Sequence, residues 1–408
     1  MLHVITRLDA GAGGNTLMSA TGMDRTRYET WIAGGPGGPL WAKARRAGVH
    51  VVELPHLHRD VSAVEDMRTL IELVSLIRRE RFAIVHVHSA KSGVLGRLAA
   101  LFCRVPVIIY TLHGRDPWWP APDGSASQLR DALPGTARVF LAIERSLRAA
   151  TDRFIAVAPT VARDAVLARI ATPGKVDVAA SAVDLDSIPL GSPAWLRDEL
   201  GLPRDAPVVG TVGRLDAQKA PLDFVRMAAE VARTRPHSRF VMVGDGELAG
   251  DVEELARNLG VSVLLTGYRP DAAQLAAVFD VFVISSLYEG VGRAVTEAMA
   301  SGRPVVATAV DGVVDIVIPG ATGLLADARD PVGLAERVNW MLDHPAEAAQ
   351  MGEQACALVR ELFSANRMCT ALDDVYSAAL GLVPLEPAWP RASAAAGTAA
   401  SSGSLANR

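Results

Sequence analysis

The sequence predicts an α/β protein with two doubly wound parallel-sheet domains that face each other across a cleft, and three observations support this. Short runs rich in aliphatic residues alternate with amphipathic helical patterns along most of the chain. These runs are apolar at nearly every position, which is typical of parallel strands covered by helices on both faces. The alternation occurs twice, on either side of a segment rich in proline and glycine.

The first half begins with a strand pattern and then alternates strands with helices. Residues 63–79 place apolar side chains three or four positions apart, which indicates a helix with one buried face, and residues 139–150 are also amphipathic. We expect strands at residues 2–6, 28–33, 49–54, 84–88, 107–111 and 154–157.

The second half repeats this pattern. We expect strands at residues 207–212, 239–243, 261–265, 281–284 and 304–307, and helices at 221–234, 251–259, 271–279 and 294–300. The predicted domains are therefore residues 1–187 and residues 207–362, joined by a linker at 188–206 that contains several prolines and glycines. The aperiodic stretch of Ala, Ser, Gly and Pro at residues 384–408 predicts a disordered tail.

Composition excludes several classes of protein. Of the 408 residues, 50% are hydrophobic and 21% are charged, so wholesale disorder is excluded. No uncharged apolar run approaches the ~18–20 residues of a membrane-spanning helix, and the first residues lack the basic start of a secretory signal. Cys103, Cys356 and Cys369 are too far apart for a disulfide framework or a zinc set, so we expect free thiols in the reducing cytoplasm.

Charge is unevenly distributed between the two halves. Residues 1–187 carry 23 Lys and Arg against 18 Asp and Glu, whereas residues 188–408 carry 18 against 27. The excess in the first half is too small for a nucleic-acid-binding face, so we expect no nucleic-acid partner. It is compatible with ordinary surface charge, or with peripheral contact to an anionic lipid surface at the inner face of the membrane.

Loops that follow strands are the candidates for a site, because ligands of doubly wound folds bind at the carboxyl ends of the strands. The first such loop, residues 9–16, contains Gly13 and Gly14, whose small size lets a ligand approach the backbone. It is not a dinucleotide fingerprint, because Thr16 replaces the third small residue, and it is not a Walker loop. A tight turn and a ligand loop both stay open as interpretations.

Histidines lie at the ends of two other strands of the first half. His113 comes directly after a very apolar strand and before a glycine, where its ring can hydrogen-bond a sugar hydroxyl or accept a proton. His86 and His88 lie two positions apart on a predicted strand and therefore share one face of the sheet. No third ligand follows at a matching spacing, so we expect no metal site.

Two cationic side chains bracket a loop that leads into a helix of the second half. Arg214 and Lys219 follow Gly213 at the end of a strand, an arrangement that suits a diphosphate. Each charge-assisted hydrogen bond contributes about 1.5–3 kcal/mol, against roughly 0.3–1 kcal/mol from the helix terminus, so the two cations should dominate. Two further turns after strands could bind the edge of a flat ring, and they contain Gly244 and Gly246, and Gly267, Tyr268 and Arg269.

The most specific pattern is the loop and helix at residues 285–299. Glu289 lies in a glycine turn after a strand and Glu297 about one turn into the following helix, so both carboxylates can face one cavity. Carboxylates accept hydrogen bonds from the vicinal hydroxyls of sugars. The amides at the start of the helix can hold a phosphate, and that segment contains Gly290, Val291 and Gly292.

Together these motifs resemble the retaining GT-B glycosyltransferases of glycosyltransferase family 4, over about residues 1–380. The run from Glu289 through Glu297 to residues 302–308 and 311–313 carries most of the resemblance, and the 213–219 loop and the 244–246 turn agree in order and spacing. The sequence departs from the family pattern at Val291, where a bulkier residue is usual, and at residues 181–184.

The resemblance implies a role for each candidate residue. Arg214, Lys219, Glu289 and His113 would be catalytic, with the two cations on the donor diphosphate and the other two near the donor sugar. The donor-binding residues would be Gly13, Gly14, Gly213, Gly244, Gly246, Gly267, Tyr268, Arg269, Gly290, Val291, Gly292 and Glu297, the last on the ribose hydroxyls. Residues 1–187 would be the acceptor side and residues 207–362 the donor side, and a helix at 363–380 would cross back onto the first domain.

The resemblance also implies an activity. A sugar would pass, with retention, from a UDP- or GDP-linked donor to a hydroxyl of a glycan, lipid-linked or small-molecule acceptor, in cell-envelope polysaccharide, glycolipid or glycoside synthesis. No cofactor and no metal is expected, because the Asp184-Leu185-Asp186 pair that formally matches a metal motif lies away from the donor loop. A nucleotide-sugar epimerase or hydrolase of the same architecture and a non-catalytic two-lobed sugar-binding protein stay open as alternatives.

Overall fold

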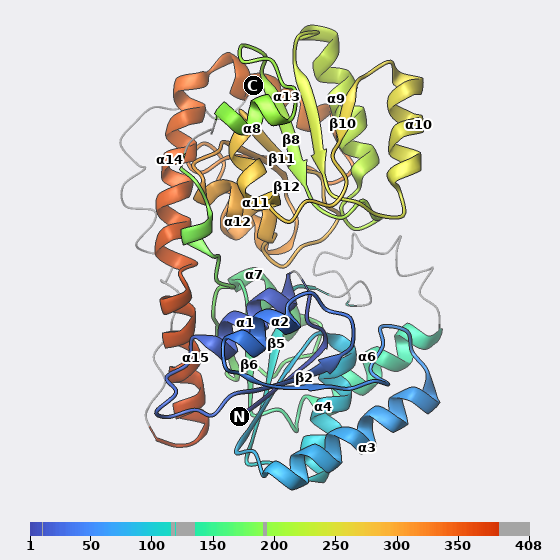
Figure 1. Ribbon diagram of the computed structural model, residues 1–408, viewed down its shortest axis with the longest axis vertical. Coiled ribbons are helices and arrows are strands. Elements are labelled where there is room, and N and C mark those ends of the chain that lie inside the picture. The colour runs from blue at the N-terminus through green and yellow to red at the C-terminus, as the bar shows by residue number, and fades with distance from the viewer. Residues whose placement is uncertain (10, 116–118, 120–134, 191–193, 383–408) are drawn as a thin grey trace.

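The computed structural model describes residues 1–9, 11–115, 119, 135–190 and 194–382. Figure 1 shows two α/β units stacked along the long axis, each with one parallel sheet covered by helices, as the sequence predicts. The expected disordered tail, residues 384–408, lies outside the described residues. A search of the described helices finds none that has both the length and the apolar character needed to span a membrane.

The first unit contains seven parallel strands in the order β3-β2-β1-β4-β5-β6-β7. The strands are β1 (Leu2–Arg7), β2 (Trp31–Gly35), β3 (His50–Glu53), β4 (Ile84–His88), β5 (Val107–Leu112), β6 (Arg153–Ala156) and β7 (Val176–Val178). The helices are α1 (Ala12–Thr21), α2 (Trp41–Arg46), α3 (Ala63–Glu80), α4 (Ala90–Phe102), α6 (Gly135–Leu147) and α7 (Pro159–Leu167).

The second unit contains six parallel strands in the order β10-β9-β8-β11-β12-β13. The strands are β8 (Val208–Val212), β9 (Arg239–Val243), β10 (Val263–Leu265), β11 (Val281–Ile284), β12 (Val305–Thr308) and β13 (Leu324–Ala326). The helices are α9 (Pro221–Thr234), α10 (Ala249–Leu259), α11 (Ala272–Leu275), α12 (Arg293–Ala300), α13 (Pro331–Asp343) and α14 (Pro345–Leu362), and the 3-10 helices are η2 (Ala276–Val278) and η3 (Asp311–Asp315).

Both sheets reverse their strand order once, and this reversal determines where a ligand can enter. In the first unit the chain runs outward from β1 to β3 and returns to place β4 on the other side of β1. In the second unit it runs from β8 to β10 and returns with β11 beside β8. The loops after β1 and β4, and those after β8 and β11, therefore diverge and leave a crevice at the carboxyl ends of the strands.

The two units also contact each other directly beside this crevice. Helix α7 of the first unit begins opposite η3 of the second, and the carboxylate of Asp315 accepts hydrogen bonds of 2.9 Å from the amide and the hydroxyl of Thr160. A carboxylate at a helix N-terminus satisfies free amides and interacts favourably with the helix dipole. The pKa of Asp315 is nonetheless raised by burial.

The last helix, α15 (Ala365–Ala379), returns to the first unit, as predicted for residues 363–380 (Figure 1). Ser364 caps it, because its hydroxyl accepts from the amide of Arg367. Its buried face packs against side chains of β4, β5 and β6. At the helix surface the Asp373 carboxylate accepts a hydrogen bond from Tyr28 and forms an ion pair with Arg27. The first unit therefore takes part of its core from the opposite end of the chain.

Two expectations about individual elements need correction, and two further features were not predicted. The second strand begins at Trp31 rather than residue 28, because the amide of Tyr28 turns back onto the carbonyl of Asp24. The helix expected at 271–279 divides into α11 and η2. The predicted linker at residues 188–206 contains the short helix α8 (Ala194–Glu199). The short strands β7 and β13 were not predicted.

We predict that Leu372→Ala lowers the apparent free energy of unfolding by about 2–5 kcal/mol, because Leu372 is buried between α15 and the first sheet. Urea-induced unfolding followed by circular dichroism measures it. Leu167→Ala is the control, since that leucine is 59% exposed at the end of α7. Equal losses in the two variants would contradict the proposed contribution of α15.

Candidate active site

A cavity of about 240 Å³ lies between the two units at the carboxyl ends of their strands. The first unit lines it with the residues that follow β4 and β5, among them Ser89, His113 and Arg115. The second unit lines it with Gln218 and with the loop that contains Glu289 and Gly290. The cavity therefore brings together loops that the sequence places about 175 residues apart.

The two units meet here backbone against backbone. A side chain at Gly290 would collide with the carbonyl oxygen of His113, and one at Gly312 would collide with the carbonyl oxygen of Gly290. Gly114 also packs against the backbone of Gly290. Only glycine, which has no side chain, lets the two backbones come this close, so the Glu289–Gly290 turn lies against the backbone of His113.

Lys219 and Glu289, both predicted catalytic, form a direct ion pair across two loops of the second unit. Glu289 is buried, and its Oε1 also accepts a 2.8 Å hydrogen bond from Ser286. Two further bonds join the loops, from the Gln218 amide to the Tyr288 carbonyl at 3.0 Å and from the Ser285 hydroxyl to the Lys219 carbonyl at 3.0 Å. The carboxylate is thus held in place by side chains of its own unit.

Arg214, the other predicted cation, is about half exposed. It pairs with Asp216 at 2.9 Å and donates to Gln218 at 3.1 Å. Its side chain is therefore more accessible than that of Lys219, and its partners lie on its own loop. The structure places both cations on one loop, at the entrance to α9.

Glu297 lies one turn into α12 and accepts a 2.7 Å hydrogen bond from Arg293. Burial raises the pKa of Glu297, and the neighbouring Arg293 opposes that shift. Arg293 also reaches the first unit, since a side chain at Gly14 would overlap its guanidinium. Arg293 was not predicted as a site residue, although its i,i+4 spacing from Glu297 was a signal.

Asp311 is a second site residue that the sequence reasoning did not assign. One carboxylate oxygen accepts a 2.8 Å hydrogen bond from the amide of Glu289, and the other lies 3.3 Å from the Arg115 guanidinium. Burial raises the pKa of Asp311 to about 6, against the opposing effect of Arg115. Asp311 therefore fixes the backbone of the glutamate-glycine turn and links it to the first unit.

The remaining predicted residues form the walls of nearby turns. Gly244 has a φ of 144° and leaves no room for a side chain beside the Gly213 carbonyl, and its amide donates to Gly267 at 3.0 Å. Gly246 packs on Leu215 in the same way, and Gly13 packs on Leu8. Gly292, with a φ of 82°, begins α12, and Val291 is buried in the core.

Tyr268 and Arg269 do not line the cavity. Tyr268 is 74% exposed. Arg269 is held by Asp271 and by Glu199 of α8, each at 2.7 Å. Their assignment to donor binding stays a prediction, and for Arg269 the observed contacts are structural ones.

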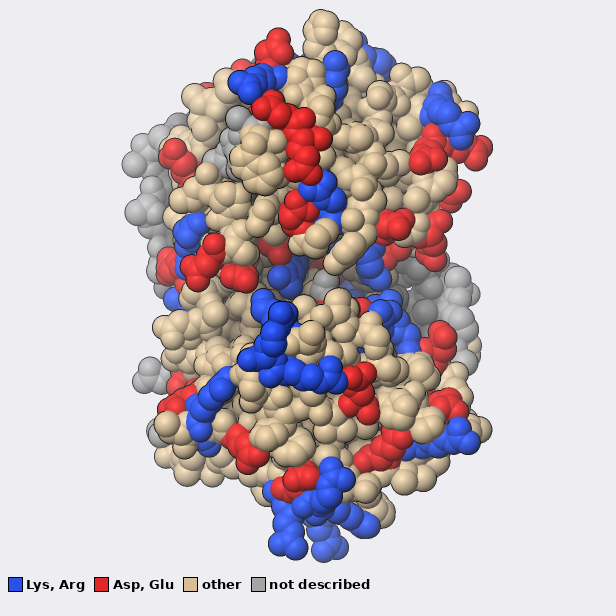
Figure 2. Space-filling view, viewed as in Figure 1, with Lys and Arg blue, Asp and Glu red and all other residues tan. Residues whose placement is uncertain are grey.

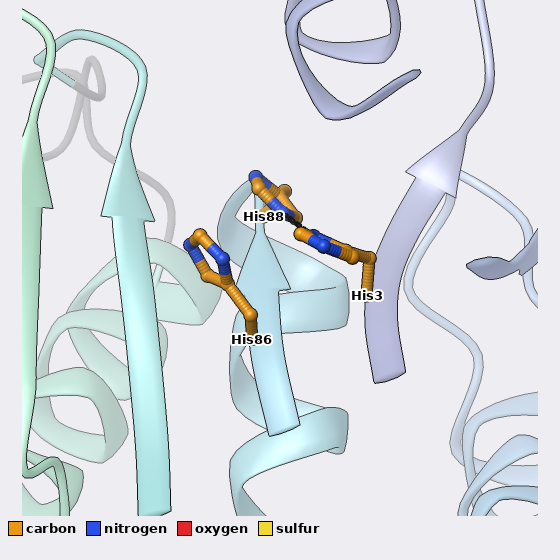
Figure 3. A group of neighbouring side chains, drawn as sticks. All are labelled: His3, His86 and His88. Carbon is orange, nitrogen blue, oxygen red and sulfur yellow. Dashed lines mark hydrogen bonds between the residues drawn. The ribbon is translucent and has the colours of Figure 1, made fainter. Parts of the chain in front are cut away.

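Four imidazoles gather at the floor of the site. His3 on β1 lies opposite His86 on β4 in the sheet register, and His88 lies two residues further on the same face (Figure 3). His88 is joined to His3 at 3.0 Å and to His113 at 3.1 Å by ring nitrogens. No third ligand follows His86 and His88 at a matching spacing in the sequence, but the neighbouring strand β1 places His3 beside them. The expectation that no metal binds stays a prediction.

These side chains are the candidates for a metal, since ligand atoms of His3, His86 and His88 lie within 4.8 Å of one another. Five of their six ring nitrogens already have hydrogen-bond partners, and the exception among the described residues is Nε2 of His3. His86 is bonded through one nitrogen to Tyr376 at 2.7 Å and through the other to Thr111 at 2.6 Å. A metal would have to displace bonds that satisfy fully buried groups, so the donor set fits a hydrogen-bonded cluster better.

Burial determines the charge of this cluster. It lowers the pKa of His3 to about 3 and that of His113 to about 4, and it lowers the pKa values of His86 and His88 well below the ordinary value. All four imidazoles are therefore neutral at pH 7.

A larger cavity, of about 690 Å³, lies elsewhere in the second unit. It is lined by residues such as Asp280 and Arg303, which come just before β11 and β12 and so lie at the opposite end of the sheet. None of the predicted site residues lines it. The smaller cavity is the one that carries the candidate chemistry.

Comparisons with known proteins agree with this architecture. Residues 16–187 match the family model described as Glycosyltransferase Family 4, and residues 206–344 match the model described as Glycosyl transferases group 1. An Escherichia coli protein named UDP-Gal:alpha-D-GlcNAc-diphosphoundecaprenol alpha-1,3-galactosyltransferase is 33% identical over 289 residues, 68% of this chain and 70% of its own length. A Catenulispora acidiphila protein named D-inositol 3-phosphate glycosyltransferase 2 is 34% identical over 310 residues, 72% of this chain and 70% of its own length.

Solved structures show the same fold. Anabaena HepE in complex with UDP-glucose superposes with a TM-score of 0.76 at 20% identity, covering 92% of this chain and 99% of that one. Sucrose-phosphate synthase from Thermosynechococcus elongatus superposes with a TM-score of 0.74 at 20% identity, covering 94% and 99%. The chain therefore belongs to glycosyltransferase family 4, and it is a glycosyltransferase with the GT-B fold.

Proposed function

We propose that the protein transfers a glycosyl group, with retention, from a UDP- or GDP-linked sugar to a hydroxyl acceptor. The observation that carries the proposal is the cavity between the units, where His113 of one unit faces the Glu289–Gly290 turn of the other, next to the ion pair of Lys219. Such an arrangement can bind a sugar through its hydroxyls while cations sit beside its leaving group.

The two cations would hold the donor diphosphate. Arg214 is about half exposed, and the side chains that it contacts among the described residues, Asp216 and Gln218, lie on its own loop, so it can turn toward a phosphate at small cost. Lys219 would exchange part of its contact with Glu289 for the phosphate, and Glu289 would then accept hydrogen bonds from the sugar. Glu297, beside Arg293 at the start of α12, would accept hydrogen bonds from the ribose hydroxyls.

The reaction would break the bond between the anomeric carbon and the diphosphate oxygen, and form a bond from that carbon to the acceptor oxygen on the same face. The acceptor proton would pass to a phosphate oxygen of the donor. Negative charge grows on the leaving diphosphate, where Arg214 and Lys219 stabilise it. We infer no covalent glycosyl-enzyme intermediate. The side chains supply two positive charges at the leaving group, so no metal is required.

The first unit would receive the acceptor and touch a membrane surface. The face of α3 that points away from the core exposes Val64, Met67 and Ile71, at 60%, 57% and 62%. Arg78 continues this face and lies over the exposed ring of Phe102 on α4, 5.0 Å from its centre. Arg79, Arg81 and Arg104 are exposed nearby, and Figure 2 shows Lys and Arg gathered at the end of this unit that lies away from the cleft.

This combination of apolar and basic side chains fits an anionic lipid surface at the cytoplasmic face of a membrane. Apolar side chains enter the boundary between headgroups and acyl chains, and the arginines pair with lipid phosphates. A lipid-linked acceptor would then be presented at the first unit. The Escherichia coli relative, whose name specifies a diphosphoundecaprenol-linked acceptor, supports this interpretation.

A donor panel tests the proposed function. We expect a UDP- or GDP-sugar to raise the thermal unfolding midpoint, because a ligand that binds only the folded state stabilises it. With that donor and an acceptor, NMR of the product should show the anomeric configuration of the donor, and the rate should persist in EDTA. Inversion, free sugar or epimer as the only product, or loss in EDTA with recovery in Mn²⁺ would each contradict the corresponding part of the proposal.

We predict that Arg214→Ala lowers kcat/KM by roughly 10- to 100-fold, because one charge-assisted hydrogen bond to the leaving group contributes about 1.5–3 kcal/mol. Initial rates at varied donor concentration measure the loss. Arg226→Ala is the control, since Arg226 is about half exposed on α9 and pairs with Asp223 in its own helix. A turnover that is the same in both variants would exclude Arg214 from the diphosphate site.

We predict that the double variant Met67→Glu with Ile71→Glu binds vesicles containing phosphatidylglycerol at least fivefold more weakly than the parent protein, since the added charges repel the anionic surface. Co-sedimentation measures binding. The control is Leu259→Glu with Val332→Glu, which adds the same charge at exposed positions of the second unit. Equal weakening in both double variants, or no vesicle binding by the parent protein, would contradict the assigned surface.

A further inference from the structure

Three buried histidines beneath the cavity, His3, His86 and His88, have no role in the proposed function. His3, His86 and His88 are fully buried, whereas His113 is partly exposed and lines the cavity. Ring nitrogens connect three of them in a row, with 3.0 Å between Nδ1 of His3 and Nε2 of His88, and 3.1 Å between Nδ1 of His88 and Nε2 of His113. The row thus leads from the interior of the first sheet to the cavity.

A neutral imidazole carries one N–H group and one lone pair, so each contact between two nitrogens needs a donor on one side and an acceptor on the other. His88 uses both of its nitrogens in this way. If His88 donates to His113, it must accept from His3; if it accepts from His113, it must donate to His3. Only two arrangements of the protons are possible, and each specifies one tautomer for all three rings.

The two arrangements differ at the ends of the row. In one, His113 carries its proton on Nδ1, and Nε2 of His3 is a bare lone pair. In the other, Nδ1 of His113 is the lone pair, and Nε2 of His3 is a buried N–H group. Nε2 of His3 has no hydrogen-bond partner among the described residues. In both arrangements Nε2 of His113 is occupied by His88, so Nδ1 is the ring nitrogen left for a ligand.

We propose that His88 and His3 are positioning residues, which hold the His113 ring in one orientation and one tautomer so that its Nδ1 presents a single, defined hydrogen-bonding group to the substrate. This rests on the proposed function for the role of His113. His86 is not a member of the row but packs against it. Its own nitrogens are hydrogen-bonded to Tyr376 and Thr111, and its ring packs on His88 with centroids 4.2 Å apart.

The surroundings of the row keep it uncharged. His3 is next to His86 and within electrostatic reach of the chain amino group, and His88 is surrounded by the three other imidazoles. His113 shares its cavity with Arg115 and Glu289, which are themselves paired with Asp311 and Lys219. No described carboxylate contacts the rings of His3 or His88, so protonation of the row has nothing to stabilise it.

The test compares His3→Leu with His3→Asn. Asparagine places an amide close to the position of Nδ1 and can still bond His88, whereas leucine fills the space without a polar group. His3 does not line the cavity, so neither variant removes a substrate contact. Nitrogen-15 NMR of histidine-labelled protein reports the tautomer and protonation of His113 directly, and it needs no enzymatic activity.

We expect the His113 ring of the parent protein to show one tautomer and to stay neutral down to about pH 5. In His3→Leu the ring should average between tautomers, and its pKa should rise from about 4 toward the ordinary 6.5, because a loosened ring is better hydrated. A group that works as neutral imidazole is lost as pH falls through its pKa, so the acid limb of the kcat profile should move toward neutral pH. In His3→Leu we expect kcat to fall about tenfold with little change in donor KM. His3→Asn should restore most of kcat and most of the original pH profile.

Several results would overturn the proposal. One is tautomer averaging of His113 in the parent protein, which needs no variant and so is unaffected by misfolding. Another is an equal effect of His3→Leu and His3→Asn on the His113 signals, which would indicate packing alone. A third is a stoichiometric metal in the purified protein that His3→Asn removes. If no sugar transfer is found but the NMR results hold, the positioning stands and the proposed function fails.

Discussion

Close approach of two backbones at the centre of the molecule is the constraint on which the site depends. The Glu289–Gly290 turn of the second unit lies directly against the His113–Gly114 segment of the first, and no side chain fits between them. The Asp311 carboxylate fixes the turn through the amide of Glu289 and reaches Arg115 across the boundary. This contact is made by peptide groups, which have few ways to rearrange. It therefore fixes the Glu289 carboxylate and the His113 imidazole, and with them the cations of the 214–219 loop, relative to one another.

The charged side chains named at the cleft are paired with one another. Lys219 pairs with Glu289, Arg293 with Glu297, and Arg115 with Asp311. A charge of this kind left unpaired in a partly buried site would cost several kcal/mol, so the acidic and basic groups keep each other in place until a substrate arrives. A donor diphosphate and its hydroxyls would replace these contacts with others of the same type. Binding would therefore be an exchange of partners rather than the filling of an unsatisfied site.

Much of the fold could be predicted from sequence, because most of the strands are continuous apolar runs and the longer helices have clear apolar faces. The strands β7 and β13 could not, since three residues at a sheet edge carry little pattern. The loop residues Lys219, Glu289 and Glu297 could be proposed from sequence because glycines or strand ends lie near them. His3 was missed because its proximity to His88 depends on the register of β1 against β4, and Asp311 because its role depends on a contact with Glu289 across the second unit.

The return of α15 to the first unit has a consequence for how the protein is made. Strands β1 to β7 emerge from the ribosome first, yet the face formed by β4, β5 and β6 stays uncovered until residues 365–379 are synthesised. The second unit, whose strands and helices α9 to α14 are contiguous in the chain, can complete its core before that. The unit that is synthesised before the other is thus the last to close, and its apolar sheet face stays exposed to aggregation for longer during synthesis.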